Sequence, residues 1–139
     1  MSPDAYPTYV LDSFALLAFL NGESGMQRVD SMLRAAQGRQ AHVCLSLINL
    51  GEVLYISERE RGLPLTQQVL SAIEQLPIEL LDASRARVLA AGHIKARYRL
   101  AYADAFAVAA AQEFDGTVLT GDPEFKSVET DGLIRVEWL

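Results

Sequence analysis

The sequence contains very few of the residues that form disulfides, zinc sites or catalytic triads. Cys44 is the only cysteine, so no disulfide can form within the chain, and we expect a reducing, cytoplasmic setting with this thiol on a buried strand. The two histidines, His42 and His93, form no zinc-binding pattern with cysteine and have no Ser or Cys partner that indicates a triad. The chemistry of the protein must be sought in other residues.

Long apolar runs and glycine-rich phosphate loops are also missing. No apolar run is long enough to cross a bilayer, and the N-terminal MSPDAYPTYV does not have the basic-then-apolar order of a signal peptide, so we expect no membrane partner. No glycine-rich motif of the P-loop or dinucleotide-binding type occurs. Because no repeat or Pro/Gly-rich linker divides the chain, we predict a single domain over residues 1–139.

Basic residues are outnumbered, since 12 Lys and Arg face 18 Asp and Glu, which gives a formal net charge of -6. Proteins that bind nucleic acids usually carry an excess of Lys and Arg, so this balance argues weakly against that class. Net charge averages over the whole surface, however, and a bound metal ion would neutralise some of the acids. Half of the residues are apolar and 22% are charged, which is typical of a globular protein.

Strand and helix patterns alternate along the chain. Short apolar or β-branched runs predict five strands, at residues 8–12, 41–45, 78–81, 117–120 and 134–137. Helical spacing and capping residues predict helices at 13–21, 24–38, 46–61, 66–75, 82–100 and 102–114, the fifth of them capped by Asp82. This alternation indicates an α/β fold, with a parallel sheet of about five short strands and helices on both faces.

Four acidic residues lie in apolar sequence, where charged side chains are rare: Asp12 in YVLDSFALLAFL, Glu52 in LINLGEVLY, Asp104 in LAYADAFAVAAA and Asp122 in TVLTGDPEF. Few basic residues are near them in the sequence. Carboxylates that gather without a counter-charge indicate a bound divalent cation. The four acids therefore predict a metal site, provided that the fold brings them together.

The predicted elements place these acids at one edge of the sheet. Asp12 ends the first strand and Asp122 follows the fourth, so both lie at the carboxyl edge. Glu52 and Asp104 lie near the beginnings of two helices that start from the same edge. Ligands of open α/β sheets bind at this edge, where the strand order reverses.

Each acid taken alone also has a structural interpretation. Asp12 is placed to cap a helix, Asp104 to interact with a helix dipole, and Asp122, in Gly-Asp-Pro, to form a turn. Glu52 is in mid-helix and is the hardest to explain in this way. The convergence of all four favours the metal site.

At these residues the sequence resembles the PIN-domain nucleases, and among them the VapC-type toxins of bacterial toxin–antitoxin pairs. The resemblance covers essentially the whole chain and rests on four ordered segments: YVLDSFALLAFL, LINLGEVLY, LAYADAFAVAAAQEFDGTVLTGDPEF and IRVEWL. It implies a three-layer α/β/α PIN-like domain in which the first and fourth strands are neighbours. It also implies that the catalytic and metal-binding acids are Asp12, Glu52, Asp104 and Asp122.

Other positions match the family beside these acids. Ser13 and Thr120 fall on its supporting hydroxyl positions, and Phe125 falls on the aromatic position after the last acid. Gly121 stands where the family often has a polar or basic residue, so one contact of the site is expected to be missing. Glu124 is near enough to join the cluster, but its sequence context favours a solvent-exposed loop acid.

The resemblance implies a Mg²⁺- or Mn²⁺-dependent endoribonuclease that hydrolyses RNA phosphodiester bonds and acts as a toxin inhibiting translation or growth. The partners it implies are an RNA substrate, a cognate antitoxin that covers the active site, and a second copy of the chain in a homodimer. Tyr55 and Leu63 are candidates for such interfaces. Lys95 and Arg99, expected one turn apart on a single helix, are candidates for phosphate contacts.

Two other functions are also compatible with the sequence. A PIN-fold protein without activity would only bind RNA or protein, although the complete set of four acids argues against this. A receiver-type phosphoacceptor domain is another small α/β protein with clustered acids. It needs a lysine directly after a late strand, whereas Lys126, the only late lysine, follows Asp122.

Overall fold

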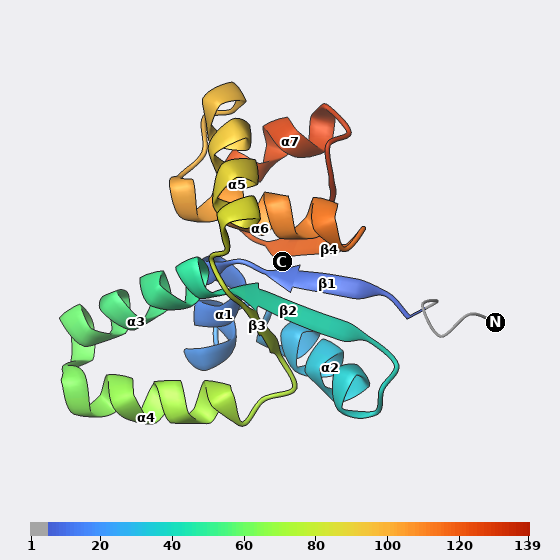
Figure 1. Cartoon of the computed structure of the whole chain (residues 1–139). Coiled ribbons are helices and arrows are strands. Elements are labelled where there is room, and N and C mark those ends of the chain that lie inside the picture. The colour runs from blue at the N-terminus through green and yellow to red at the C-terminus, as the bar shows by residue number, and fades with distance from the viewer. Residues whose placement is uncertain (1–5) are drawn as a thin grey trace.

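A computed structural model describes residues 6–139 and contains one sheet of five parallel strands (Figure 1). The central strand pairs on both sides, with Val10 opposite Cys44 in one neighbour and Val118 in the other. The strand order is β3-β2-β1-β4-β5, so the predicted adjacency of the first and fourth strands is confirmed. The strands are β1 (Thr8–Leu11), β2 (His42–Ser46), β3 (Glu79–Leu81), β4 (Thr117–Thr120) and β5 (Arg135–Trp138).

Helices cover both faces of the sheet. Figure 1 shows α1 to α4 on one side and α5 to α7 on the other, which confirms the three-layer α/β/α fold. A short 3-10 helix, η2, and the short helix α7 connect β4 to β5 and were not predicted. The helices are α1 (Ser13–Leu20), α2 (Met26–Gln37), α3 (Leu47–Arg61), α4 (Leu63–Glu74), α5 (Arg85–Arg97), α6 (Tyr102–Glu113), η2 (Pro123–Phe125) and α7 (Lys126–Thr130).

The alternation of side chains along the strands explains the two helical layers. Val10 and Cys44 are fully buried in a core cluster with α5 and α6. Leu11 and Leu45, one residue further along the same strands, are fully buried in a second cluster with α1, α2 and α3. Successive strand residues point to opposite faces, so each apolar run supplies both cores.

Helix α6 is buried along most of its length, because all residues from Ala105 to Ala111 belong to the core. Its alanines favour helix formation and have side chains small enough for close packing against the sheet. Asp104 lies in the first turn of this helix and is only 6% exposed. The core therefore fixes the position of that carboxylate.

The predicted cap of α5 is wrong. Ser84, not Asp82, caps the helix, and its side chain accepts a hydrogen bond of 3.3 Å from the backbone N–H of Arg87. Asp82 instead forms an ion pair with the guanidinium of Arg87. A serine nearer to the first helical turn can reach its free N–H groups, whereas the aspartate lies too early in the chain.

The end of α5 also differs from its prediction. The helix stops at Arg97, the backbone becomes extended at Tyr98, and Leu100 then packs into the core with 1% exposure. Arg99 consequently lies outside the helix, so its predicted place one turn from Lys95 on the same helix is wrong. Within residues 6–139, no helix combines the length and the apolar composition that a bilayer span requires.

Candidate metal centre

The strand order reverses between β1 and β4, and the chain carries acids just beyond both of these strands. Asp12 directly follows β1, Thr120 is the last residue of β4, and Asp122 comes two residues later. The arrows of β1 and β4 point to this same edge of the sheet (Figure 1). This is the position at which open α/β sheets bind ligands.

Asp12 is held at this edge by two hydrogen bonds. One carboxylate oxygen accepts a bond of 2.8 Å from the backbone N–H of Ala15 and so caps α1, while the other accepts a bond from the hydroxyl of Thr120. The side chain is only 1% exposed, and this burial raises its pKa from the usual 3.8 to about 7, although both hydrogen bonds oppose the rise. The proposed helix-cap role of Asp12 and its place in an acidic cluster therefore coexist.

Asp104 lies at the centre of the acidic group. Burial is the main cause that raises its pKa from 3.8 to about 7, and the negative charges of four other carboxylates add to the rise. These neighbours are Asp12, Asp122, Glu52 and Glu124, in order of decreasing effect. The structure thus places the other three predicted acids, and Glu124 as a fifth, close enough to Asp104 for their charges to act on it.

The tightest group consists of Asp104, Asp122 and Glu124, whose carboxylates each offer an oxygen within 4.8 Å of the other two. Glu124 reaches this group because η2 turns the chain back, with its backbone N–H donating to Asp122 Oδ1 at 2.9 Å. The interpretation of Glu124 as a solvated loop acid was therefore incomplete, since it is exposed but belongs to the cluster. Asp12 and Glu52 lie outside this tightest group.

Asn49 connects the segments that carry these acids, and this role was not predicted from the sequence. Its side-chain amide donates to Ser13 Oγ at 3.1 Å and to the backbone carbonyl of Ala103 at 3.2 Å. Ser13 returns a bond of 3.3 Å from its hydroxyl to the carbonyl of Asn49. Asn49 thus joins α3 to the residue after Asp12 and the residue before Asp104. The only sequence signal is its position as a polar residue between Ile48 and Leu50, one helical turn before Glu52.

The amide oxygen of Asn49 is buried and has no hydrogen-bond partner among residues 6–139. Buried polar atoms are nearly always paired, with protein groups or with ordered water. Since the same side chain touches the chain neighbours of Asp12 and Asp104, an ordered water beside the acids would satisfy it. This orphaned atom fits a site that contains solvent or a hydrated ion.

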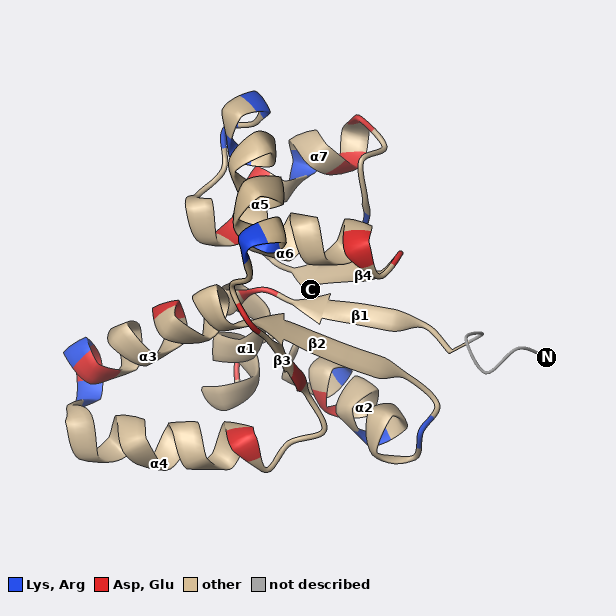
Figure 2. Ribbon diagram, viewed as in Figure 1, with Lys and Arg blue, Asp and Glu red and all other residues tan. Residues whose placement is uncertain are grey.

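Basic side chains do not neutralise the cluster. None of the ion pairs within residues 6–139 involves Asp12, Glu52, Asp104, Asp122 or Glu124. Figure 2 shows basic segments at the C-terminal ends of α3 and α5, away from the sheet. Lys95 and Arg99, the predicted phosphate contacts, are both exposed near the end of α5. In the described part of the chain the five acids therefore form no ion pair with a basic side chain, which leaves them available to a cation.

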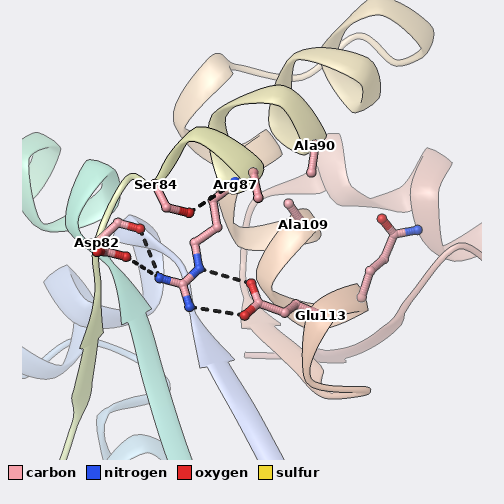
Figure 3. Close-up of a pocket in the computed structure, with 8 residues that line it drawn as sticks. Asp82, Ser84, Arg87, Ala90, Ala109 and Glu113 are labelled. Carbon is pink, nitrogen blue, oxygen red and sulfur yellow. Dashed lines mark hydrogen bonds and ion pairs between the residues drawn. The ribbon is translucent and has the colours of Figure 1, made fainter.

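A separate cavity of about 630 Å³ lies between α5 and α6 (Figure 3). Arg87 crosses it, donating two hydrogen bonds of 3.0 Å to Glu113 and pairing with Asp82. None of the five acids lines this cavity, and its α6 residues, Ala109, Gln112 and Glu113, belong to the second half of that helix. Because both carboxylates already hold the guanidinium, Arg87 is not available to bind a phosphate.

Comparison with known proteins identifies the family. The sequence profile of the PIN domain matches residues 9–130, a range that includes all five acids. The chain belongs to the PIN-domain family. This membership removes the receiver-type alternative. A comparison with curated proteins gave no match.

Several solved structures, among them a toxin–antitoxin complex from Klebsiella pneumoniae, are similar in fold to this PIN domain. The VapBC2 complex of Rickettsia felis, bound to a promoter DNA fragment, contains a chain with 16% identity and a TM-score of 0.72, over 94% of this chain and 98% of that one. DNA-bound VapBC of Salmonella typhimurium gives 19% identity and a TM-score of 0.69, over 95% and 98%. VapC20 of Mycobacterium tuberculosis is described as a sarcin-ricin loop cleaving toxin. It has 17% identity and a TM-score of 0.64, over 86% of this chain and 94% of that one. At these identities the likeness shows a shared fold.

Proposed function

We propose that this PIN-domain protein is a Mg²⁺- or Mn²⁺-dependent endoribonuclease and the toxin of a toxin–antitoxin pair. The proposal is carried by the carboxylates of Asp104, Asp122 and Glu124, which lie within 4.8 Å of one another and have no paired base in residues 6–139. Two carboxylates about 4 Å apart repel by roughly 4 kcal/mol at an effective dielectric of about 20. A divalent cation with a preference for oxygen ligands removes this repulsion.

The residues divide into two groups in this proposal. Asp104, Asp122 and Glu124 would hold the ion, and Asp12 and Glu52 would face water beside it, since Mg²⁺ retains several waters. When bound, the ion would lower the pKa of a water and offset charge on the phosphate oxygens. Glu52 is half-buried and makes no side-chain hydrogen bond within residues 6–139, so its carboxylate is available to accept a proton from an attacking water.

Thr120 and Ser13 are proposed to position this site rather than to react. Thr120 holds Asp12 through its hydroxyl. Ser13 accepts the hydrogen bond by which Asn49 connects α3 to α1. Asp12 is then fixed with one oxygen on a helix N-terminus and the other on β4. Hydrogen bonds from neighbouring residues fix the geometry of the groups around a metal, and removing them reduces metal affinity or activity.

The assignment as a toxin rests on the fold shared with chains of toxin–antitoxin complexes. By this analogy the partner is a small antitoxin, the chain forms a homodimer, and both act in the cytoplasm. Exposed apolar side chains are available for such contacts, including Tyr55 at 48% exposure and Leu63 at 51%. Single exposed apolar side chains are common on proteins, so the proposed interface rests on the analogy with these complexes.

RNA cleavage by the purified protein tests the proposal. Wild type should cleave cellular RNA with Mg²⁺ or Mn²⁺ and lose this activity in EDTA, while Asp12→Asn and Asp104→Asn should be inactive but folded. Glu60→Gln is the matched control, because Glu60 is an exposed acid at the end of α3. Melting curves of all variants show whether an inactive protein is also unfolded.

The outcomes separate the possible functions. Wild-type rates in the two Asn variants would refute the assignment of the site, whatever the fold. RNA binding without cleavage, in any metal, would favour a PIN domain that only binds. Charge reversal at Lys95 or Arg99 should weaken RNA binding and reduce its salt dependence if these exposed residues contact phosphate.

A further inference from the structure

Phe14 is an exposed aromatic residue beside the acidic cluster. It lies in the first turn of α1, between buried Ser13 and buried Ala15, yet its own exposure is 45%. Asp12 caps the same turn, so the ring is two residues from a buried carboxylate. A single exposed apolar side chain needs no special explanation, and Phe14 becomes informative only through what surrounds it.

The ring of Phe14 packs against Gly121. A Cβ atom added there would lie 2.3 Å from Cε1 and 2.4 Å from Cζ of Phe14, so the ring edge rests directly on the glycine. Gly121 does not have the positive φ that would itself require glycine. The absence of a side chain therefore leaves room for the aromatic ring, between Thr120 and Asp122 of the proposed site.

A small pocket lies beside Phe14. Its volume is about 240 Å³, and it is lined by Phe14, Leu17 and Ala18 of α1 and by Glu23 and Ser24 of the loop that follows. The helical residues give the pocket apolar walls, which suit the flat, apolar face of a nucleobase. The Glu23 carboxylate, also in the lining, disfavours a phosphate but can accept a hydrogen bond from a base amino group.

We propose that Phe14 and this pocket form a subsite that stacks one unpaired base of a single-stranded RNA, next to the phosphate at the acidic cluster. The proposal rests on the ribonuclease function proposed above and specifies its substrate as an RNA with an unstacked base at that position. Single-stranded RNA is recognised by proteins through bases stacked on aromatic side chains. The ring already rests on Gly121, so binding a base should cost little conformational entropy of this side chain.

Steady-state kinetics on a short single-stranded RNA with one mapped cleavage site test the subsite. Phe14→Ala should raise KM by about 5- to 150-fold, the factor that corresponds to loss of one stacked base, with little change in kcat. Phe14→Tyr keeps the aromatic face and should behave like wild type. Phe14→Leu keeps the apolar bulk without that face and should resemble Phe14→Ala. Leu89→Ala, at a 56% exposed residue on α5, is the control for loss of exposed apolar surface.

An abasic nucleotide at each position beside the cleavage site identifies the stacked base. For wild type, one such position should raise KM by the same factor as Phe14→Ala, and the two changes together should cost no more than either alone. If Phe14→Ala and Phe14→Leu have the wild-type KM while Asp104→Asn is inactive, the nuclease function stands and the subsite is refuted, leaving the pocket to another occupant. If wild type cleaves no RNA, both proposals fail.

Discussion

The hydroxyl of Thr120 donates a hydrogen bond to the carboxylate of Asp12, 108 positions earlier in the chain. The same hydroxyl oxygen accepts a bond of 2.9 Å from the backbone N–H of Asp122. One threonine thus links the end of β1 to the loop after β4, across the point where the strand order reverses. Both Thr120 and Asp12 are buried, so water cannot replace these bonds without a change in structure.

Replacing Thr120 with Val tests this link, since Val keeps the shape and the strand preference but removes the hydroxyl. The buried carboxylate of Asp12 then loses a donor, which should destabilise the protein by about 1–3 kcal/mol and reduce metal-dependent cleavage. Thr120→Ser should retain both properties. Urea unfolding and the cleavage rate are the measurements, and a Val variant equal to wild type in both would contradict the link.

Asp104→Asn should stabilise the protein when metal is absent. The variant removes a charge that is unfavourable because it is buried and because four neighbouring carboxylates repel it, and the gain in unfolding free energy at pH 8 is expected to be on the order of 2 kcal/mol. Mg²⁺ or Mn²⁺ should raise the melting temperature of wild type but not that of the variant. Glu60→Gln serves as the control, and an equal metal response in all three proteins would count against the site.

The stability of the metal-free protein should decrease as pH rises from about 4 to 7 because of Asp12 and Asp104. Both have a pKa of about 7 in the folded state against 3.8 as the ordinary value, so between these values the folded state binds more protons than the unfolded state. Their protonated forms stabilise the fold fully at low pH, and this contribution is lost as they ionise. Unfolding in EDTA at several pH values measures the effect.

The double variant Asp12→Asn/Asp104→Asn isolates this contribution from that of all other acids. The difference in unfolding free energy between the variant and wild type should be small at pH 4, increase towards pH 7 and then level off. Parallel curves for the two proteins would show that neither carboxyl is perturbed. Added Mg²⁺ should reverse the trend for wild type, because the ion binds the ionised carboxylates.

Asn49→Ala should reduce both stability and activity, because it removes the two hydrogen bonds that connect α3 to Ser13 and Ala103. A loss of about 1–3 kcal/mol is expected from the unpaired groups that remain. Cleavage should fall further than the loss of folded protein explains, since the acids at the starts of three helices are no longer held together. Activity corrected for the folded fraction tests this, and a proportional loss would reduce Asn49 to a structural residue.

Gly121→Ala should strain the contact with Phe14, since the added Cβ would lie 2.3 Å from the ring. Because the atoms in contact are the far end of a side chain that is 45% exposed, the ring can turn aside, and the cost is expected to be about 1 kcal/mol or less. Phe14→Ala should relieve this cost in the double variant. Chemical unfolding of the two single variants and the double variant gives the coupling energy, and strictly additive effects would mean that the ring does not rest on Gly121 in solution.

The sequence was sufficient to predict the three layers of the fold and to select four of the five acids in the candidate site. Both predictions depend on short-range patterns in the sequence. Runs such as Val10-Leu11 have apolar residues for both faces of a strand, and an acid in such a run is conspicuous. The cap of α5 was mistaken because Asp82 and Ser84 are both good capping residues, and only the backbone path selects between them. Glu124 was undervalued because the turn of η2, which brings it back to Asp104, has no clear sequence signal.

Asn49 was missed for a different physical reason. Its partners, Ser13 and Ala103, are 36 residues before it and 54 residues after it, so no local pattern relates the three. The end of α5 depends in the same way on the core, which takes up Leu100. Tertiary packing decides such features, and spacing along the chain does not contain them.

The pairing of β1 with β4 also determines when the acidic cluster can form during synthesis of the chain. Asp12 leaves the ribosome early, but Thr120, Asp122 and Glu124 are made more than a hundred residues later. An N-terminal fragment that ends before β4 has neither the cluster nor the strand that fixes Asp12. Under the proposed function, the active site could therefore form only after residues 120–124 have been translated.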